Sequence, residues 1–193
     1  MNMQELVRKT RSYRRFHEDF SIGMEVLEGL VELARLSASA RNLQPLKFML
    51  CNQKDRNELI FPELGWAGYL PDWPGPIPGE RPSAYIIVLG DLIITKTFGY
   101  DHGIATQSIL LGATSRGLGG CIIGSAKRDR LREKLAIPDH FEILNVLALG
   151  KPKETVQIEP LGLDGDIKYW HGADGTHHVP KRALEELIVS FGD

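Results

Sequence analysis

Apolar residues recur at helical spacing in two stretches of the chain. Residues 24–35 place leucines, a valine and an alanine on one face and glutamates on the other, with Ser21 in position to cap the helix start. Residues 181–191 repeat the same period, which predicts a terminal helix. Shorter helices are expected over 2–10 and 54–61, and over 127–137, where Pro138 would stop the helix.

Short apolar runs between these segments predict strands. The runs 46–52, 83–91 and 142–150 suit buried strands, and a shorter run over 120–125 suits a fourth. Strands and helices mix along the chain, and the helices are long enough to cover both faces of one sheet. The length of 193 residues fits a single domain, 1–193.

The segment 62–82 breaks this pattern and predicts a long loop. It contains six prolines, four glycines and two tryptophans. Prolines remove backbone donors from helices and strands, and long ordered loops often serve as lids. Two readings of Trp66 and Trp73 stay open: they pack onto the domain, or they belong to a lid over a binding site.

A helix expected over 101–116 carries a stripe of small residues on one side. These residues follow one another at spacings of three, four and three: Ala105, Ser108, Gly112 and Ser115. Such a stripe lets another helix approach closely, so the helix belongs either to the core or to a subunit interface. Asp101 and His102 are expected to cap its start at residue 103.

Composition and charge narrow the function classes. Hydrophobic residues make up 42% of the chain, the formal net charge is −2 and the pI is about 6.3, which argues against a nucleic-acid partner. No apolar run approaches the roughly 18 residues needed to span a bilayer, and the N-terminus lacks the apolar core of a secretory signal. Cys51 and Cys121 lie in apolar runs, as buried reduced thiols of a cytoplasmic protein would.

Two polar segments are candidates for binding. Arg11, Ser12 and Arg14 in "RKTRSYRRF" suit a phosphate, because guanidinium groups bind its oxygens in pairs and a hydroxyl adds a donor. A solvated basic face is the alternative, and this stretch alone favours it. Lys181 and Arg182 would open the terminal helix and add a second anion-binding element.

The other segment is "SASARNLQPLKF", residues 37–48, where a helix turns into a strand. Its short side chains offer more hydrogen-bonding groups than a plain corner needs. Neither a dinucleotide fingerprint nor a P-loop or GxSxG elbow occurs, and the histidines of "HGADGTHH" lack metal-ligand spacing. No metal site is therefore expected. This pattern suits a protein whose chemistry belongs to a bound phosphorylated cofactor.

Four segments in order resemble motifs of the FMN-dependent nitroreductase family. They are "TRSYRRF", "SASARNLQPLKF", "GIATQSILLGATSRGLGGCIIGS" and "VPKRALEELI", and their order and separations fit the family over almost the whole chain. The sequence departs from the family where Ala38 replaces a frequent Pro, Leu46 a frequent Trp and Thr10 a frequent Arg. Lys9 or Arg15 would compensate for the last change.

The resemblance implies roles for particular residues. Arg11, Ser12 and Arg14 would hold the ribityl phosphate of FMN, joined by Lys181 or Arg182. Ser37, Ser39 and Asn42 would face the flavin of a partner subunit, Gln44 would fix the corner, and the backbone of Gly124 and Ser125 would approach the flavin N5 edge. No side chain is assigned as catalytic, because the flavin carries the chemistry.

The resemblance also implies the fold and the activity. The fold would be an α+β three-layer α/β/α sandwich with a mixed, mainly antiparallel sheet, forming a homodimer with a C-terminal arm and helix over 151–193. The activity would be ping-pong hydride transfer from NADPH or NADH to a nitroaromatic, quinone or other small electrophile. Alternatives are a relative with different flavin chemistry, such as dehalogenation or flavin fragmentation, and a non-catalytic flavin-binding dimer.

Overall fold

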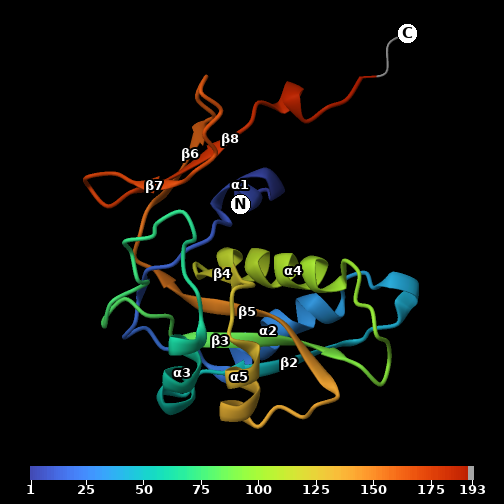
Figure 1. Ribbon diagram of the computed structural model, residues 1–193. Helices are drawn as coiled ribbons and strands as arrows, with labels where there is room; N and C mark the ends of the chain where they lie inside the picture. Colours follow the sequence, from blue (N-terminus) through green and yellow to red (C-terminus); the bar gives the residue numbers. More distant parts are fainter. Residues whose placement is uncertain (191–193) are drawn as a thin grey trace.

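An antiparallel sheet forms the centre of the molecule in the computed structural model, which describes residues 1–190 (Figure 1). Its five strands run in the order β1-β5-β3-β2, with β4 also paired to β5. They are β1 (Phe16–His17), β2 (Leu46–Cys51), β3 (Ala84–Asp91), β4 (Gly119–Ile123) and β5 (Phe141–Pro152). Every residue of β3 is buried, because helices cover the sheet on both faces.

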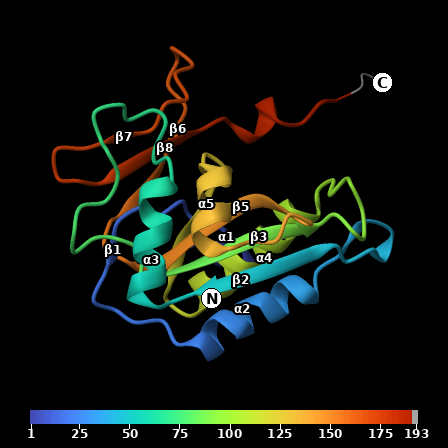
Figure 2. The ribbon, with the colours of Figure 1, turned by 60° about the horizontal axis from the view of Figure 1, so that its bottom comes forward.

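The helices make two outer layers, which confirms the predicted three-layer α+β fold. Helices α2 (Met24–Arg35) and α4 (Asp101–Ser115) pack on one face, and α3 (Lys54–Ile60) and α5 (Arg128–Leu135) pack on the other (Figure 2). Side chains of β3 alternate between the layers, so that Ile86 joins the α2–α4 core. Its neighbour Ile87 joins the α3–α5 core.

The helix starts follow local capping chemistry. Helix α1 (Met3–Lys9) begins with a capping box between Asn2 and Glu5. Helix α2 begins after Gly23, so the expectation that Ser21 caps it was wrong. Helix α4 begins at Asp101 rather than at residue 103, and Tyr100 takes the cap position.

The small-residue stripe of α4 faces α2 within the same chain. A side chain at Gly112 would place its Cβ 2.2 Å from Leu33 Cδ1. Ser108 shares a hydrogen bond with Ser37, which follows α2, and Ala105 is buried. These contacts support the core-helix reading of the stripe.

A second, smaller sheet follows the main one and lies to one side of it (Figure 1). Its strands are β6 (Val156–Pro160), β7 (Trp170–His171) and β8 (His177–Lys181), with β8 between a parallel β6 and an antiparallel β7. We call residues 156–181 the C-terminal module.

The terminal helix expected over 181–191 does not form in the described residues. Lys181 ends β8, and only a short 3-10 turn, η3 (Leu184–Glu186), follows, while Phe191 lies outside the described residues. Leu184 and Leu187 remain 65% exposed. Apolar periodicity alone does not form so short a helix, because the apolar face needs a surface to pack against.

The loop 62–82 has no helix or strand after the 3-10 turn η2 (Phe61–Glu63), as predicted for these described residues. Trp66 lies 5.7 Å from the Phe61 ring and covers Gly75, whose φ of +110° excludes most other residues. Trp73 meets the ring of His171 edge-on at 5.7 Å. Both indoles are half-buried and pack on the molecule.

Cys51 and Cys121 are buried and both thiols are free, as expected. Burial raises the pKa of both thiols. No helix within residues 1–190 is long and apolar enough to cross a bilayer.

Candidate functional site

A cavity of about 280 Å³ gathers most of the cations that the sequence singled out. We call it the anion cavity. The N-terminal segment, α4, β4 and the C-terminal module all line it: Thr10, Arg11, Ser12, Arg14, Gln107, Leu110, Ile122, Tyr169, His177, Val179 and Lys181. Arg11, Ser12, Arg14 and Lys181 therefore meet as expected, although they come from opposite ends of the chain.

Hydrogen bonds to the backbone fix the N-terminal wall of the anion cavity. Arg11 donates through Nε to Thr10 O at 2.6 Å and through Nη2 to Val7 O at 3.1 Å. Tyr13 N donates to Gly120 O at 3.0 Å, which ties the segment to β4. Burial lowers the pKa of Arg11, and a bound anion would offset that cost of burying its charge.

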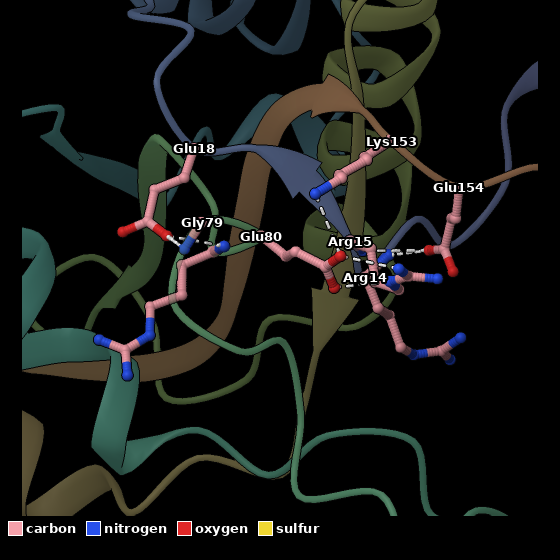
Figure 3. A network of polar contacts seen from close by, with 8 residues as sticks. Arg14, Arg15, Glu18, Gly79, Glu80, Lys153 and Glu154 are labelled. Atoms are coloured by element: carbon pink, nitrogen blue, oxygen red, sulfur yellow. Dashed lines mark hydrogen bonds and ion pairs between the residues drawn. The ribbon is translucent and has the colours of Figure 1, made fainter. Parts of the chain in front are cut away.

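Arg14 is held at its backbone and at its guanidinium. Its backbone N and that of Arg15 both donate to Glu154 Oε1, as Figure 3 shows. Its guanidinium carbon lies 4.9 Å from the centroid of the Tyr169 ring, and its Nη1 lies 3.3 Å from His177 Nε2. Burial raises the pKa of Glu154, and the two backbone donors oppose that rise.

Arg15 serves a different purpose from Arg14. Its Nε and Nη2 each donate to a carboxylate oxygen of Glu80 at 2.7 Å, and Lys153 Nζ lies 3.2 Å from the same carboxylate (Figure 3). Hydrogen bonding from Arg15, followed by that from Lys153, lowers the pKa of Glu80 to about 2. Arg15 thus anchors the end of the loop 62–82 and does not line the anion cavity.

Among the histidines of the C-terminal module, His177 is buried, with only 2% exposed, whereas His171 and His178 are half-buried. Burial, with Arg14 close by, lowers the pKa of His177 to about 4. His178 Nδ1 lies 2.6 Å from Glu159 Oε1, and its ring stacks on Trp170. Within residues 1–190 no three His, Cys, Asp or Glu side chains are grouped as metal ligands.

The corner at residues 37–44 lines a separate cavity of about 420 Å³ between α2 and β2. Its hydroxyls bond to protein groups: Ser37 Oγ donates to Leu33 O, and Ser39 Oγ donates to Asp101 Oδ2 at 2.6 Å. Asp101 Oδ1 also accepts from the backbone N of Ala40 at 2.9 Å. Asp101, only 4% exposed, is the residue that fixes the corner.

Gln44 and Asn42 support each other at the exposed end of the corner. Gln44 Nε2 lies 3.2 Å from both Asn42 O and Asn42 Oδ1, and Gln44 N donates to Ser39 Oγ at 2.9 Å. Arg41, Asn42 and Gln44 have φ values of 51°, 56° and 49°. The corner is therefore a sharp left-handed turn, and its side chains are used to build it.

Gly124 and Ser125 follow β4 and connect to the loop 62–82. Ser125 Oγ donates to Gly65 O at 2.8 Å, and Gly65 N donates to Ser125 O at 2.6 Å. Neither residue lines the anion cavity or the corner cavity.

Arg182 and the corner residues lie apart from the anion cavity. Arg182 does not line the anion cavity and pairs instead with Glu186 at 3.3 Å. The anion cavity and the corner cavity share no lining residue among those described. Helix α4 lies between them, with Ala105 at the corner and Gln107 at the anion cavity.

Sequence reasoning missed the contributions of Tyr169, His177 and Asp101. His177 stood out only as part of a weak metal pattern, and Asp101 only as a helix cap. Tyr169 had no local signal, since its role depends on β7 folding back across the N-terminal segment.

Comparison with known proteins places the chain in a family. The sequence model of the nitroreductase family matches residues 7–67 and 82–151. A protein from Archaeoglobus fulgidus with the provisional name NADH dehydrogenase/NAD(P)H nitroreductase is 30% identical over 154 residues, which cover 75% of this chain and 83% of that protein. The chain belongs to the nitroreductase family.

Solved structures agree with this fold. One similarly named protein from Parabacteroides distasonis has a TM-score of 0.65 and 25% identity, with 79% of this chain and 89% of that chain covered. A protein from Exiguobacterium sibiricum with the provisional name nitroreductase, solved in complex with FMN, has a TM-score of 0.66 and 20% identity, with 79% of this chain and 89% of that chain covered.

Proposed function

We propose that the protein is an FMN-dependent oxidoreductase that uses NADPH or NADH to reduce a small electrophile such as a nitroaromatic or a quinone. The anion cavity carries this proposal, because three cations and a serine hydroxyl converge there without a carboxylate among its described lining residues. Guanidinium, ammonium and hydroxyl donors are what a terminal phosphate requires. Arg11, Ser12, Arg14 and Lys181 would hold the phosphate of FMN.

The surface next to the anion cavity has room for the rest of the cofactor. Gln107 lines both the anion cavity and an open hollow of about 560 Å³ along α4. Gly103, Ile104 and Ser108 also line the hollow, and Tyr100 at its edge is 87% exposed. A ligand longer than a phosphate can thus extend from the anion cavity along α4.

The bound flavin would supply the redox chemistry, taking reducing equivalents from NAD(P)H and passing them to the acceptor. NAD(P)H and the acceptor would use the same cavity in turn, in a ping-pong cycle. The chain's own residues bind and orient the cofactor. The names of the relatives support this assignment, and the Exiguobacterium sibiricum protein is one with FMN bound.

We further propose a homodimer in which the corner of one subunit closes the flavin site of the other. The segment 182–190 runs outward from the C-terminal module (Figures 1 and 2). It exposes four large apolar side chains, which is unusual unless a partner covers them: Leu184, Leu187, Ile188 and Val189. Asn42 at the corner and the backbone of Gly124 and Ser125 would then approach the flavin ring.

An absorbance spectrum tests the function directly. Purified full-length protein mixed with FMN and freed of excess ligand is expected to show flavin bands that bleach when NADPH or NADH is added without oxygen. A protein that retains no FMN would contradict the cofactor assignment. Bound FMN that neither nicotinamide bleaches would contradict the oxidoreductase assignment.

A further inference from the structure

Two segments outside the family match pack against each other. The match leaves out residues 68–81 of the loop and everything after 151. Tyr69 of the loop lies 5.1 Å from the Tyr169 ring, and its backbone N donates to Tyr169 Oη at 3.3 Å. Trp73 of the same loop meets His171. The loop therefore supports the cavity-facing side of the C-terminal module.

The module in turn contacts the guanidinium of Arg14 through two side chains. The Tyr169 ring lies 4.9 Å from the guanidinium carbon, within the range of a cation–π contact. The second contact is with His177, whose Nε2 lies 3.3 Å from Arg14 Nη1. An arginine N–H can only donate, so His177 Nε2 accepts and its proton resides on Nδ1.

These contacts matter because the rest of the structure holds the guanidinium of Arg14 only weakly. Its other hydrogen bond within the described residues is a long one, from Nη1 to Ser12 O at 3.4 Å. A free arginine side chain loses considerable rotamer entropy when it binds an anion. His177 is buried, and Tyr169 is fixed by Tyr69 and by the His177 ring at 5.1 Å, so both hold Arg14 from rigid positions.

We propose that Tyr169 and His177 are positioning residues that hold Arg14 ready for the phosphate group of the flavin. The C-terminal module, rather than the family core alone, then sets how strongly this protein prefers FMN to riboflavin. This inference rests on the proposed FMN function. It assigns a binding role to two residues that lie outside the segments matched by the family.

Titration of the full-length apoprotein with FMN and with riboflavin tests the inference. Tyr169→Leu is expected to weaken FMN binding about fivefold to tenfold through the lost ring contact, and riboflavin binding by less than about twofold. His177→Leu should do the same, while Tyr169→Phe and His177→Gln, which keep the ring and an acceptor, should remain close to the wild type. Trp170→Leu, a neighbouring change away from the anion cavity, is the matched control and should alter neither affinity.

A double-mutant cycle distinguishes a loss of Arg14 positioning from an overall disturbance of the structure. In an Arg14→Ala background, Tyr169→Leu and His177→Leu should cause no further loss of FMN affinity, because the group they hold is gone. Tyr169 is only partly buried, so Tyr169→Leu keeps the test valid even if the variant at the buried His177 fails to fold. Losses that are equal for FMN and riboflavin, or that add to Arg14→Ala, would overturn the inference. A wild-type protein that binds no FMN would overturn the proposed function as well.

Discussion

The anion cavity and the corner at residues 37–44 are both polar, yet their polar groups are used differently. At the corner, Ser37, Ser39 and Gln44 bond to other protein groups, and Asp101 accepts two of the bonds that define the turn. In the anion cavity, Arg11, Arg14 and Lys181 meet without a lining carboxylate in the described part of the chain. The corner is satisfied within one chain, whereas the anion cavity has an excess of positive charge that a ligand would balance.

The difference shows that a dense run of hydrogen-bonding side chains does not by itself mark a ligand site. Short side chains at a tight turn are used first by the backbone around them. Charges that the protein brings together without neutralising them are a stronger sign of binding, since assembling them costs free energy.

Of the changes considered, removal of the Arg14 guanidinium should have the largest effect, and it should act on the affinity for FMN. Arg14→Ala is expected to weaken FMN binding roughly 10-fold to 100-fold, because charge-assisted hydrogen bonds contribute about 1.5–3 kcal/mol. Fluorescence titration measures the change. Arg35→Ala, at an exposed arginine paired with Glu32, is the control, and an equal loss there would show that the effect is not local.

Removal of the Asp101 carboxylate, which fixes the corner, should reduce the stability of the fold more than it reduces phosphate binding. Asp101→Ala leaves the partly buried Ser39 hydroxyl and the Ala40 N without their charged acceptor, and should lower the free energy of unfolding by about 2 kcal/mol. Urea denaturation provides the measurement. Asp139→Ala, at a fully exposed aspartate, should change stability by less than about 0.5 kcal/mol. If Asp101→Ala were equally mild, the corner would not depend on this carboxylate.

The ion pairs of Glu80, which anchor the loop 62–82, should contribute to stability in a way that depends on pH. Glu80→Gln is expected to destabilise the protein by about 2 kcal/mol at neutral pH, since it breaks a partly buried ion pair. The pKa of Glu80 is about 2 in the folded state, below its usual 4.5, so its contribution is present above pH 4.5 and is lost as pH falls toward 2. Unfolding curves of both proteins should therefore converge over that interval, and a constant gap would refute the assignment.

The smallest expected effect is that of His177, which contacts Arg14, on the pH dependence of stability. The folded-state pKa of His177 is about 4, below its usual 6.5, so the unfolded chain binds the proton more readily. Stability should fall as pH decreases from 6.5 to 4, and His177→Gln should make that slope shallower. His171, whose pKa is also lowered by burial, would keep part of the slope. Thermal unfolding across this range measures it, and an unchanged slope would mean that His177 is protonated in the folded state.

The sequence predicted the sheet, most helices and the meeting of Arg11, Ser12 and Arg14 at one cavity, because each had a local signal. Apolar runs mark β3 and β5, and Arg11, Ser12 and Arg14 lie within four residues of one another. The terminal helix was predicted wrongly, because Leu184 and Leu187 have the right spacing but no surface to cover.

The missed residues depend on contacts between distant segments. Tyr169 reaches Arg14 only because a second sheet forms after β5, and nothing near Tyr169 in the sequence indicates that. Asp101 looked like a helix cap because its partners, Ser39 and Ala40, precede it by about sixty residues.

Titration of the wild-type apoprotein with FMN and riboflavin is the most direct test of a phosphate-binding anion cavity. The two ligands share the ring system and differ in the phosphate. We expect FMN to bind at least about 100-fold more tightly, since several charge-assisted hydrogen bonds are at stake. Equal affinities would contradict the assignment of the anion cavity to the phosphate.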